Sequence, residues 1–301
     1  MGYYEICEEE KAYLAQYDIT KYERPSVAAD MTIFSIMEEG KWENFRKLPK
    51  KALKLLLIQR ATYPYKGAWA LPGGFCRSNE DVSETAKREL QEETNLQNAY
   101  LSPIGSFGDV GRDPRGWIIS NTFLALVDAE KCKLRAGSDA GEARWFSVQL
   151  KRQEVKKEVK EDSAEMETEY ELCLLHEESG TELTAKVKEY KQFRDYHETV
   201  RYEISDSAAI AFDHAKIILH ALLQLRKNVE NEPKQVFDLM PELFTLTQLQ
   251  NAFELILDQE LLAANFRRKI ADYVLETEQV YEGMGHRPAK LFGRNVKEFY
   301  K

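Results

Sequence analysis

The sequence predicts an α/β (α+β) fold, followed by a smaller helical domain. Two observations support this. Short apolar runs alternate with one amphipathic helical stretch in the first half of the chain, and helical periodicity dominates after residue 204. The chain has 301 residues, and domains commonly contain roughly 100–200 residues. We therefore expect two domains, at residues 1–204 and 205–301.

Four short runs in the first domain are predicted to be strands, because each is apolar and bounded by polar or turn-forming residues. They lie at residues 26–37, 52–60, 116–127 and 143–148. Between the second and third runs, the motif that begins with Leu71-Pro72-Gly73-Gly74 is predicted to open a helix from about Val82 to Thr94. Strands mixed with one helix in this way indicate a layered α/β or α+β domain.

The composition changes at residue 151. The charge-dense run "KRQEVKKEVKEDSAEMETE" is predicted to be a solvated helix or a mobile connection. Two alternating stretches on either side of a Ser-Gly turn follow it, and they predict a β-hairpin. We interpret residues 151–204 as an insertion or an edge hairpin on the first domain.

The second domain begins with a long helical pattern in "DSAAIAFDHAKIILHALLQLRKNVE" (206–230). Its histidines, His214 and His220, are interpreted as packing or surface residues. Two shorter helical stretches follow, "FTLTQLQNAFELIL" and "DQELLAANFRRKIADYVL", and then the basic, glycine-rich "EGMGHRPAKLFGRN". A helix, a short turn, a second helix and a basic hairpin give the outline of a winged helix-turn-helix.

The composition suits a cytoplasmic protein without a membrane segment. The formal net charge is −9, and no apolar run reaches the length of about 18 residues that a membrane-spanning helix needs. The acidic N-terminus lacks the apolar core of a secretion signal. The four cysteines show no Cys-x-x-Cys spacing, so free thiols are expected.

The predicted helix at 82–94 carries clustered acidic residues. Glu89 and Glu93 are four residues apart and share a face, and Glu92 flanks them. Val82 and Ala86 project to the same side, so these carboxylates border the apolar stripe instead of opposing it. Burying clustered carboxylates without partners costs several kcal/mol per ion. A solvated acidic face is the alternative, but the geometry favours a divalent cation such as Mg²⁺, which prefers oxygen ligands.

The spacing around this helix matches a known signature. From Gly74, five residues lead to Glu80 and seven more to "REL", which continues as "QEETNL". This resembles the Nudix signature, and the upstream "GAWALPGG" also resembles that family. Asn95 replaces the final glycine of the signature, a mild departure because Asn tolerates the left-handed conformation that ends a helix.

The resemblance covers roughly residues 27–150. It implies a Nudix α/β/α sandwich with a mixed sheet, and Mg²⁺- or Mn²⁺-dependent cleavage of a diphosphate bond in a nucleoside diphosphate compound. It also implies roles for individual residues. In this resemblance, Glu89, Glu92 and Glu93 would bind the metal and activate water. Glu80 and Arg88 would form a structural ion pair. The Gly73–Gly74 backbone would hold its loop close to metal and phosphate.

A second motif precedes the third predicted strand. "GSFGDVGRDPRGWIIS" places Arg112 and Arg115 around Asp113-Pro114. It resembles the "RDPRGW" segment of a Nudix branch that contains ADP-ribose pyrophosphatases and Nudix-related regulators. The two arginines are candidate ligands for phosphate or ribose, because Arg presents a planar fork to phosphate oxygens. The alternative is a charged turn with an Asp-Arg salt bridge.

Glu142 lies just ahead of Trp145, in a stretch that resembles the same branch. The resemblance implies a further metal ligand or catalytic base at this position. The alternative is a surface carboxylate or an ion pair at the start of a strand.

The C-terminal region resembles the winged helix of the same branch, which places basic residues where DNA phosphates would be contacted. They are Arg267, Arg268, Lys269, Arg287 and Lys290. A winged helix that has lost DNA binding and serves as a charged or dimer-forming surface is the alternative. The overall negative charge also opposes approach to DNA.

Two functions of different classes follow. One is a Mg²⁺-dependent pyrophosphohydrolase acting on ADP-ribose or a related nucleoside diphosphate sugar. The other is a metabolite-sensing transcription regulator whose Nudix domain binds such a compound and whose winged helix binds DNA. The complete set of glutamates favours the enzyme. The resemblance further implies a homodimer.

Overall fold

The computed structural model describes residues 6–40, 50–96, 99, 101–134, 140–281 and 288–299. The strands of the first domain are β1 Ser26–Glu38, β2 Lys51–Arg60, β3 Trp69–Ala70, β4 Gly73–Phe75, β5 Leu101–Phe107, β6 Ile118–Leu126, β7 Ala140–Val159, β8 Ser163–His176, β9 Thr181–Arg194 and β10 His197–Asp206. The helices are α1 Glu8–Gln16, α2 Val82–Thr94, α3 His214–Asn231, α4 Leu246–Leu257, α5 Ala263–Ile270 and α6 Val296–Phe299.

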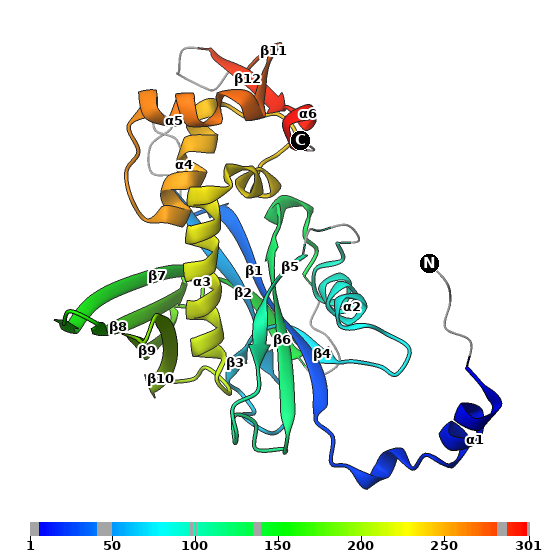
Figure 1. Ribbon diagram of the computed structural model, residues 1–301. Coiled ribbons are helices and arrows are strands. Elements are labelled where there is room, and N and C mark those ends of the chain that lie inside the picture. Colours follow the sequence, from blue (N-terminus) through cyan, green and yellow to red (C-terminus); the bar gives the residue numbers. More distant parts are fainter. Residues whose placement is uncertain are drawn as a thin grey trace.

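The strands form one mixed sheet in the order β10-β9-β8-β7-β2-β1-β6-β5, with β3 paired to β2 and β4 to β1 (Figure 1). β1 runs parallel to β6 and antiparallel to β2. The mixed sheet that the sequence predicted is therefore confirmed, and the predicted strands correspond to β1, β2, β6 and β7.

A helix covers each face of this sheet. On one face, Met31 and Ile33 of β1 pack in a cluster with Leu90 of α2. On the other face, Phe34 belongs to the large core cluster that contains Ile218 of α3. Because successive strand residues point to opposite faces, β1 supplies both cores, and the predicted α/β/α arrangement is confirmed.

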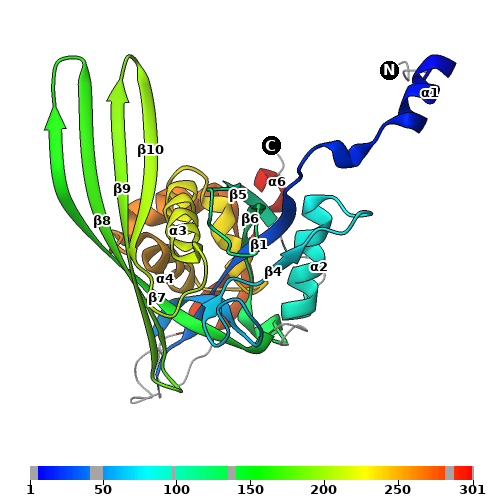
Figure 2. The ribbon, with the colours of Figure 1, turned by 90° about the horizontal axis from the view of Figure 1, so that it is seen from below.

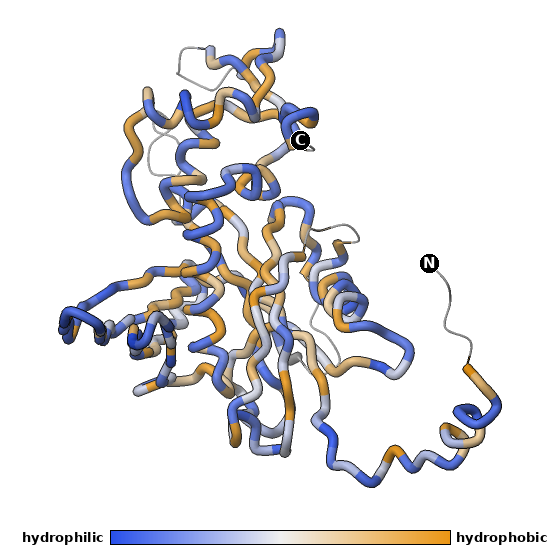
Figure 3. Tube along the Cα trace, in the orientation of Figure 1, coloured by the Kyte–Doolittle hydropathy of each residue, from blue (hydrophilic) through white to orange (hydrophobic). Residues whose placement is uncertain are grey.

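The charged run after residue 151 was predicted to be a helix or a mobile connection, and this prediction was wrong. β7 continues through it to Val159 and pairs with β8, which in turn pairs with β9. Figure 2 shows the β7–β8 and β9–β10 hairpins extending from the body, and hydrophilic residues predominate at the β7–β8 tip (Figure 3). Lys and Glu favour helices in isolation, but here cross-strand pairs such as Lys151–Glu171 accompany the sheet pairing.

The predicted helix of the second domain starts later than its periodicity suggested. Residues 207–213 are not helical, and α3 begins at His214. Ala209 and Phe212 have positive φ values of 60° and 55°. The N–H of Trp69 donates to Ala209 O, and the N–H of Ala211 donates to Trp69 O, both at 2.8 Å. The segment is thus held against β3 before the helix starts.

The winged helix lies at the far end of α3 (Figure 1). It contains α4, α5 and an antiparallel hairpin of β11 Val274–Tyr281 and β12 Ala289–Arg294. These elements confirm the predicted helix, turn, helix and hairpin. The division of the chain at residue 204 stays a prediction. Within the described residues, none of the helices combines the length and apolar character needed to span a bilayer.

Candidate functional site

The acidic helix α2 is fixed at both ends by its own sequence. At its N-terminus, Asp81 Oδ1 accepts the N–H of Glu84 at 2.8 Å, and Glu84 Oε2 accepts the N–H of Asp81 at 2.8 Å. This reciprocal capping box satisfies two N–H groups that the helix leaves unpaired. At the C-terminus, Asn95 has φ 59° and ψ 19°. It takes the left-handed conformation that the sequence predicted.

Two of the three predicted metal ligands lie on the inner side of α2. Glu89 and Glu93 are 8% and 4% exposed, whereas the side chain of Glu92 is half exposed. The Glu89 carboxylate lies against Gly74, where an added Cβ would be 2.1 Å from Oε1. A side chain at position 74 would therefore require the Glu89 carboxylate to move. Burial raises the pKa of Glu89 above its usual value, although Arg88 opposes this shift.

Arg88 lies between the acidic side chains. Its Nε donates to Glu80 Oε1 at 2.9 Å, and its Nη2 donates to Glu80 Oε2 at 3.1 Å. This bidentate contact lowers the pKa of Glu80. Nη1 of the same guanidinium is 2.5 Å from Glu89 Oε1 and 3.5 Å from Glu92 Oε1. Arg88 thus joins the loop at Glu80 to two of the predicted metal ligands.

The three glutamates supply the oxygen ligands that Mg²⁺ or Mn²⁺ prefers, but they do not converge. Within the part of the chain that the structure describes, no group of three or more His, Cys, Asp or Glu side chains is placed to hold a metal ion. Glu89 and Glu92 both face the Arg88 guanidinium instead. The donor chemistry fits a divalent cation, but the described arrangement of these side chains does not.

β4 separates the acidic helix from the predicted arginines. Its register pairs Gly74 with Ala29 and Phe75 with Ala28, and Ala29 packs with Ala86 of α2. Directly paired residues share a face and neighbours alternate, so Gly74 faces α2 and Phe75 faces the opposite side. The two halves of the predicted site therefore lie on opposite faces of a three-residue strand.

Arg115 lies on the Phe75 side of β4. Its guanidinium carbon is 5.1 Å from the centre of the Phe75 ring and 5.3 Å from that of Phe212. It also makes two hydrogen bonds to the Asp113 carboxylate, at 3.0 and 2.7 Å. The side chain remains 40% exposed. Stacking between aromatic rings leaves it accessible from solvent while its direction is fixed.

Arg112 is held differently. Its Nε is 2.9 Å from Asp213 Oδ2, and its Nη2 is 2.6 Å from Asp213 Oδ1. The side chain is only 4% exposed. Burial opposes the positive charge, but the hydrogen bonds and charge of Asp213 outweigh this effect and raise the pKa of Arg112. A ligand can engage this guanidinium only if Asp213 releases it.

The sequence analysis missed Asp213 and Asp30 as members of this cluster and assigned His214 only to packing or surface. His214 Nδ1 accepts the N–H of Leu71 at 2.9 Å, and its Nε2 lies 3.9 Å from Asp30 Oδ2. Burial lowers the pKa of His214, which preserves Nδ1 as an acceptor. No local pattern marks these residues, because their partners are distant in the chain.

Glu142 is not brought to the acidic helix. Its register pairs it with Gln59, while its neighbour Ala143 packs in the cluster that contains Leu90 of α2. Side chains alternate along a strand, so Glu142 points away from the face that α2 covers. Its Oε1 is 2.5 Å from Arg144 Nε. This is the ion pair at the start of a strand that the sequence left as the alternative.

Some basic residues of the winged helix are exposed on α5, and others contact neighbouring protein groups. Arg267 and Arg268 are exposed on α5. Lys269 Nζ donates to Glu230 O at 2.9 Å, and Lys290 is paired with Glu276 in the hairpin. The remaining predicted DNA contact, Arg287, lies outside the described residues.

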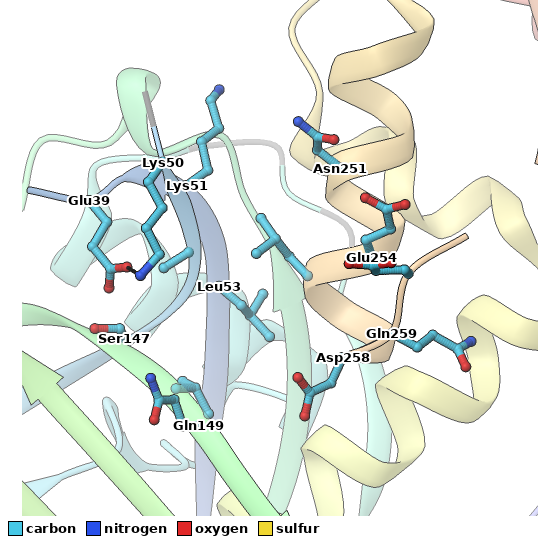
Figure 4. A pocket seen from close by; sticks show the side chains of 14 residues that line it. Glu39, Lys50, Lys51, Leu53, Ser147, Gln149, Asn251, Glu254, Asp258 and Gln259 are labelled. Atoms are coloured by element: carbon cyan, nitrogen blue, oxygen red, sulfur yellow. Dashed lines mark ion pairs between the residues drawn. The ribbon is translucent and has the colours of Figure 1, made fainter. Parts of the chain in front are cut away.

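A groove of about 750 Å³ separates the sheet from α4. Lys51 and Leu53 of β2 line one side, and Asn251, Glu254 and Asp258 line the other (Figure 4). None of the predicted site residues lines it. The groove thus lies between the two domains, which also touch where α4 meets β2 and are joined by α3.

Comparisons with known proteins agree with this two-part architecture. A family model described as NUDIX domain matches residues 48–170, and one described as NrtR DNA-binding winged helix domain matches residues 236–293. The ADPR responsive transcriptional repressor NtrR of Acinetobacter baylyi is 30% identical over 294 residues, which cover 96% of this chain and 90% of that protein. The ADP-ribose pyrophosphatase of Methanocaldococcus jannaschii is 37% identical over 141 residues, or 46% of this chain and 73% of that protein.

Solved structures are similar over nearly the whole chain. A MutT/nudix family protein from Enterococcus faecalis has a TM-score of 0.64 at 26% identity, covering 95% of this chain and 93% of its own. Shewanella oneidensis NrtR has a TM-score of 0.56 at 22% identity, covering 89% and 94%, and at that identity it supports the fold alone. From the acidic helix, the winged helix and the repressor that matches almost end to end, we conclude that this chain belongs to the Nudix family, in the branch that carries a C-terminal NrtR-type winged helix domain.

Proposed function

We propose that this protein is a DNA-binding regulator that binds ADP-ribose, or a related nucleoside diphosphate sugar, in its Nudix domain. The observation that carries the proposal is the pairing of that domain with a winged helix whose α5 exposes Arg267 and Arg268. The similarity to an ADPR-responsive repressor over 96% of the chain supports it. The sequence alone favoured the enzyme, and this full-length similarity reverses that order.

The proposed ligand site lies around β4. Arg115 is an exposed cation that a phosphate or ribose can reach, and the Phe75 ring beneath it directly follows Gly73–Gly74 in β4. Phosphate and carboxylate both suit the planar fork of Arg, so a ligand phosphate can take the place of the Asp113 carboxylate. Arg112 becomes available to the ligand only when Asp213 releases it.

DNA binding is tested with the full-length chain. Duplexes are selected from a random-sequence pool on the protein, and the affinity for the enriched duplex is measured by fluorescence anisotropy with and without ADP-ribose. We expect specific binding that weakens steeply with salt, because each contacted phosphate releases counterions. ADP-ribose should change the affinity several-fold. Failure to enrich any sequence would refute the regulator.

A second candidate function is Mg²⁺- or Mn²⁺-dependent hydrolysis of ADP-ribose. The buried carboxylates of Glu89 and Glu93 favour it, because a solvated acidic face would not bury them. The test measures AMP release from ADP-ribose by chromatography, with and without Mg²⁺. The variant Glu92→Gln, which removes one carboxylate charge, is measured in the same way. Absence of AMP in the parent protein at every metal concentration would exclude it.

We also propose a homodimer, as the family resemblance implies. Light scattering on the full chain at micromolar concentration should give about twice the 34.9 kDa of one chain. A monomer under these conditions would contradict the proposal.

A further inference from the structure

One helix reaches from the predicted ligand loop to the winged helix. α3 has 18 residues, which corresponds to about 27 Å at 1.5 Å per residue. Its apolar residues belong to the same core cluster as the sheet and the winged helix. Figure 1 shows α3 crossing the sheet and ending against the C-terminal elements. The contacts at its two ends determine whether a change at the ligand loop can move the winged helix.

At its N-terminal end, two charged contacts tie α3 to the loop at residues 109–115. Asp213, directly before the helix, holds the Arg112 guanidinium through two hydrogen bonds at 2.9 and 2.6 Å. Lys216, in the first turn, contacts the carboxylate of Asp109. The side chains of Asp213 and Lys216 are each 10% exposed. This is the loop that carries both predicted ligand arginines.

Side-chain contacts tie the same end to the segment that leads into β4 and to Arg115. His214 accepts the N–H of Leu71 at 2.9 Å, and Leu71 precedes the Pro72-Gly73 turn. The Phe212 ring lies 5.3 Å from the Arg115 guanidinium carbon. The start of α3 therefore contacts both parts of the proposed ligand site.

At its C-terminal end, α3 holds the two helices of the helix-turn-helix. Arg226 Nε donates to Ile256 O at 3.0 Å, near the end of α4, and Arg226 Nη2 is 3.3 Å from Asp258 Oδ2. Lys269 of α5 donates to Glu230 O in the last turn of α3 at 2.9 Å. The exposed arginines Arg267 and Arg268 directly precede Lys269, so the position of the DNA-facing helix depends on the end of α3.

A phosphate competes directly with the N-terminal contact. Arg binds phosphate and carboxylate with the same bidentate geometry, and Arg112 has its fork occupied by Asp213. A ligand that engages Arg112 must break this pair and leave the Asp213 carboxylate buried beside Lys216 alone, at 3.7 Å. A state with the first turn of α3 displaced relieves that cost. The ligand therefore binds the two positions of α3 with different affinity, which is the condition for shifting a conformational equilibrium.

We propose that Asp213 and Lys216 couple the ligand loop to α5, so that a nucleoside diphosphate ligand engaging Arg112 changes DNA affinity by displacing α3. This inference rests on the proposed regulatory function and assigns the residues that transmit its response. Movement of α3 shifts α4 relative to β2, so the groove between Lys51 and Asn251 changes width when the ligand binds. Coupling of this kind is reciprocal, and bound DNA changes ligand affinity by the same factor.

The test measures DNA affinity of the full-length chain with and without saturating ADP-ribose, for the parent, Asp213→Asn and Lys216→Gln. Asp213→Asn keeps the shape and removes the charge. Lys216→Gln removes the tie to Asp109, whose side chain is 71% exposed, and the 3.7 Å ion pair with Asp213, while the two hydrogen bonds between Arg112 and Asp213 stay in place. Glu167→Gln is the matched control, because it removes a charged contact to Lys188 of similar length, 2.9 Å, in the distant hairpin.

In the parent and in Glu167→Gln, saturating ADP-ribose should change DNA affinity by about fivefold or more, which is within the usual range of allosteric coupling. Both α3 variants should still bind DNA and ADP-ribose. Their DNA affinity should change by less than about twofold when ADP-ribose is added, as expected when the coupling free energy approaches zero. A full response in both α3 variants, with the parent also responding, would overturn the coupling through α3 and leave the regulator standing. A parent that binds DNA without any response to ADP-ribose would overturn the proposed function and this inference together. Should Asp213→Asn fail to fold, Lys216→Gln decides.

Discussion

The Arg112–Asp213 pair gives the sharpest prediction of stability. Both side chains are nearly buried, 4% and 10% exposed, and two hydrogen bonds join them. Removing one partner of a buried pair costs about 3–5 kcal/mol, because it leaves an uncompensated charge. In Arg112→Ala, Lys216 still lies 3.7 Å from Asp213. We therefore expect the low end of that range, about 3 kcal/mol of lost unfolding free energy.

Urea unfolding followed by tryptophan fluorescence measures this loss, and thermal unfolding should show it as a decrease in Tm of about 6–12 °C, at about 2–4 °C per kcal/mol for a domain of this size. The matched control is Arg201→Ala, which removes an ion pair whose side chains are 68% and 55% exposed, and it should cost less than about 1 kcal/mol. The double variant Arg112→Ala/Asp213→Ala should lose less stability than the sum of its single variants, since neither partner of the pair is left as a buried charge without the other. Two results would contradict a stabilising buried pair. One is an equal loss of unfolding free energy in Arg112→Ala and Arg201→Ala. The other is a double variant whose loss equals the sum of the losses in Arg112→Ala and Asp213→Ala.

Three further predictions follow from the site, the winged helix and the buried histidine. Gly74→Ala places a Cβ 2.1 Å from Glu89 Oε1. It should destabilise the fold by about 1–3 kcal/mol, as overpacking does, and weaken ADP-ribose binding in calorimetry; a variant unchanged in both would contradict the close approach. Arg267→Ala/Arg268→Ala should lower DNA affinity and reduce the slope of log K against log salt by about 2, one for each phosphate contact, and an unchanged slope would move the DNA contact elsewhere. Burial lowers the pKa of His214 below its ordinary 6.5. The unfolded chain then binds more protons between the folded-state pKa and about 6.5, so stability rises with pH across that window. His214→Asn should flatten this part of the curve of urea midpoints against pH, and a curve as steep as that of the parent would show that His214 does not titrate on unfolding.

The sequence alone determined the elements whose signals are local. The helix Val82–Thr94 was predicted with the bounds it has, because its capping residues and its apolar stripe all lie within or beside it. The left-handed Asn95 followed from the resemblance, because Asn replaces the glycine that ends the helix in the family and tolerates the same conformation. The two short helices and basic hairpin of the C-terminal domain were also identified, since each element carries its own periodicity and turn residues.

Tertiary structure decided whatever depends on partners distant in the chain. The charged run at 151–159 became a strand because β8 pairs with it, although its Lys and Glu content suits a helix. The start of α3 moved to His214 because residues 209–211 bond to the backbone of Trp69.

The candidate site divides in the same way. The sequence identified Glu89, Arg88 and Arg112 by spacing and resemblance. It could not show that Arg88 lies between the glutamates, or that Arg112 faces a carboxylate 101 residues away. Local periodicity records which face of its own element a residue occupies. The charge that meets it on that face is set by packing between elements, and no pattern within one segment encodes that.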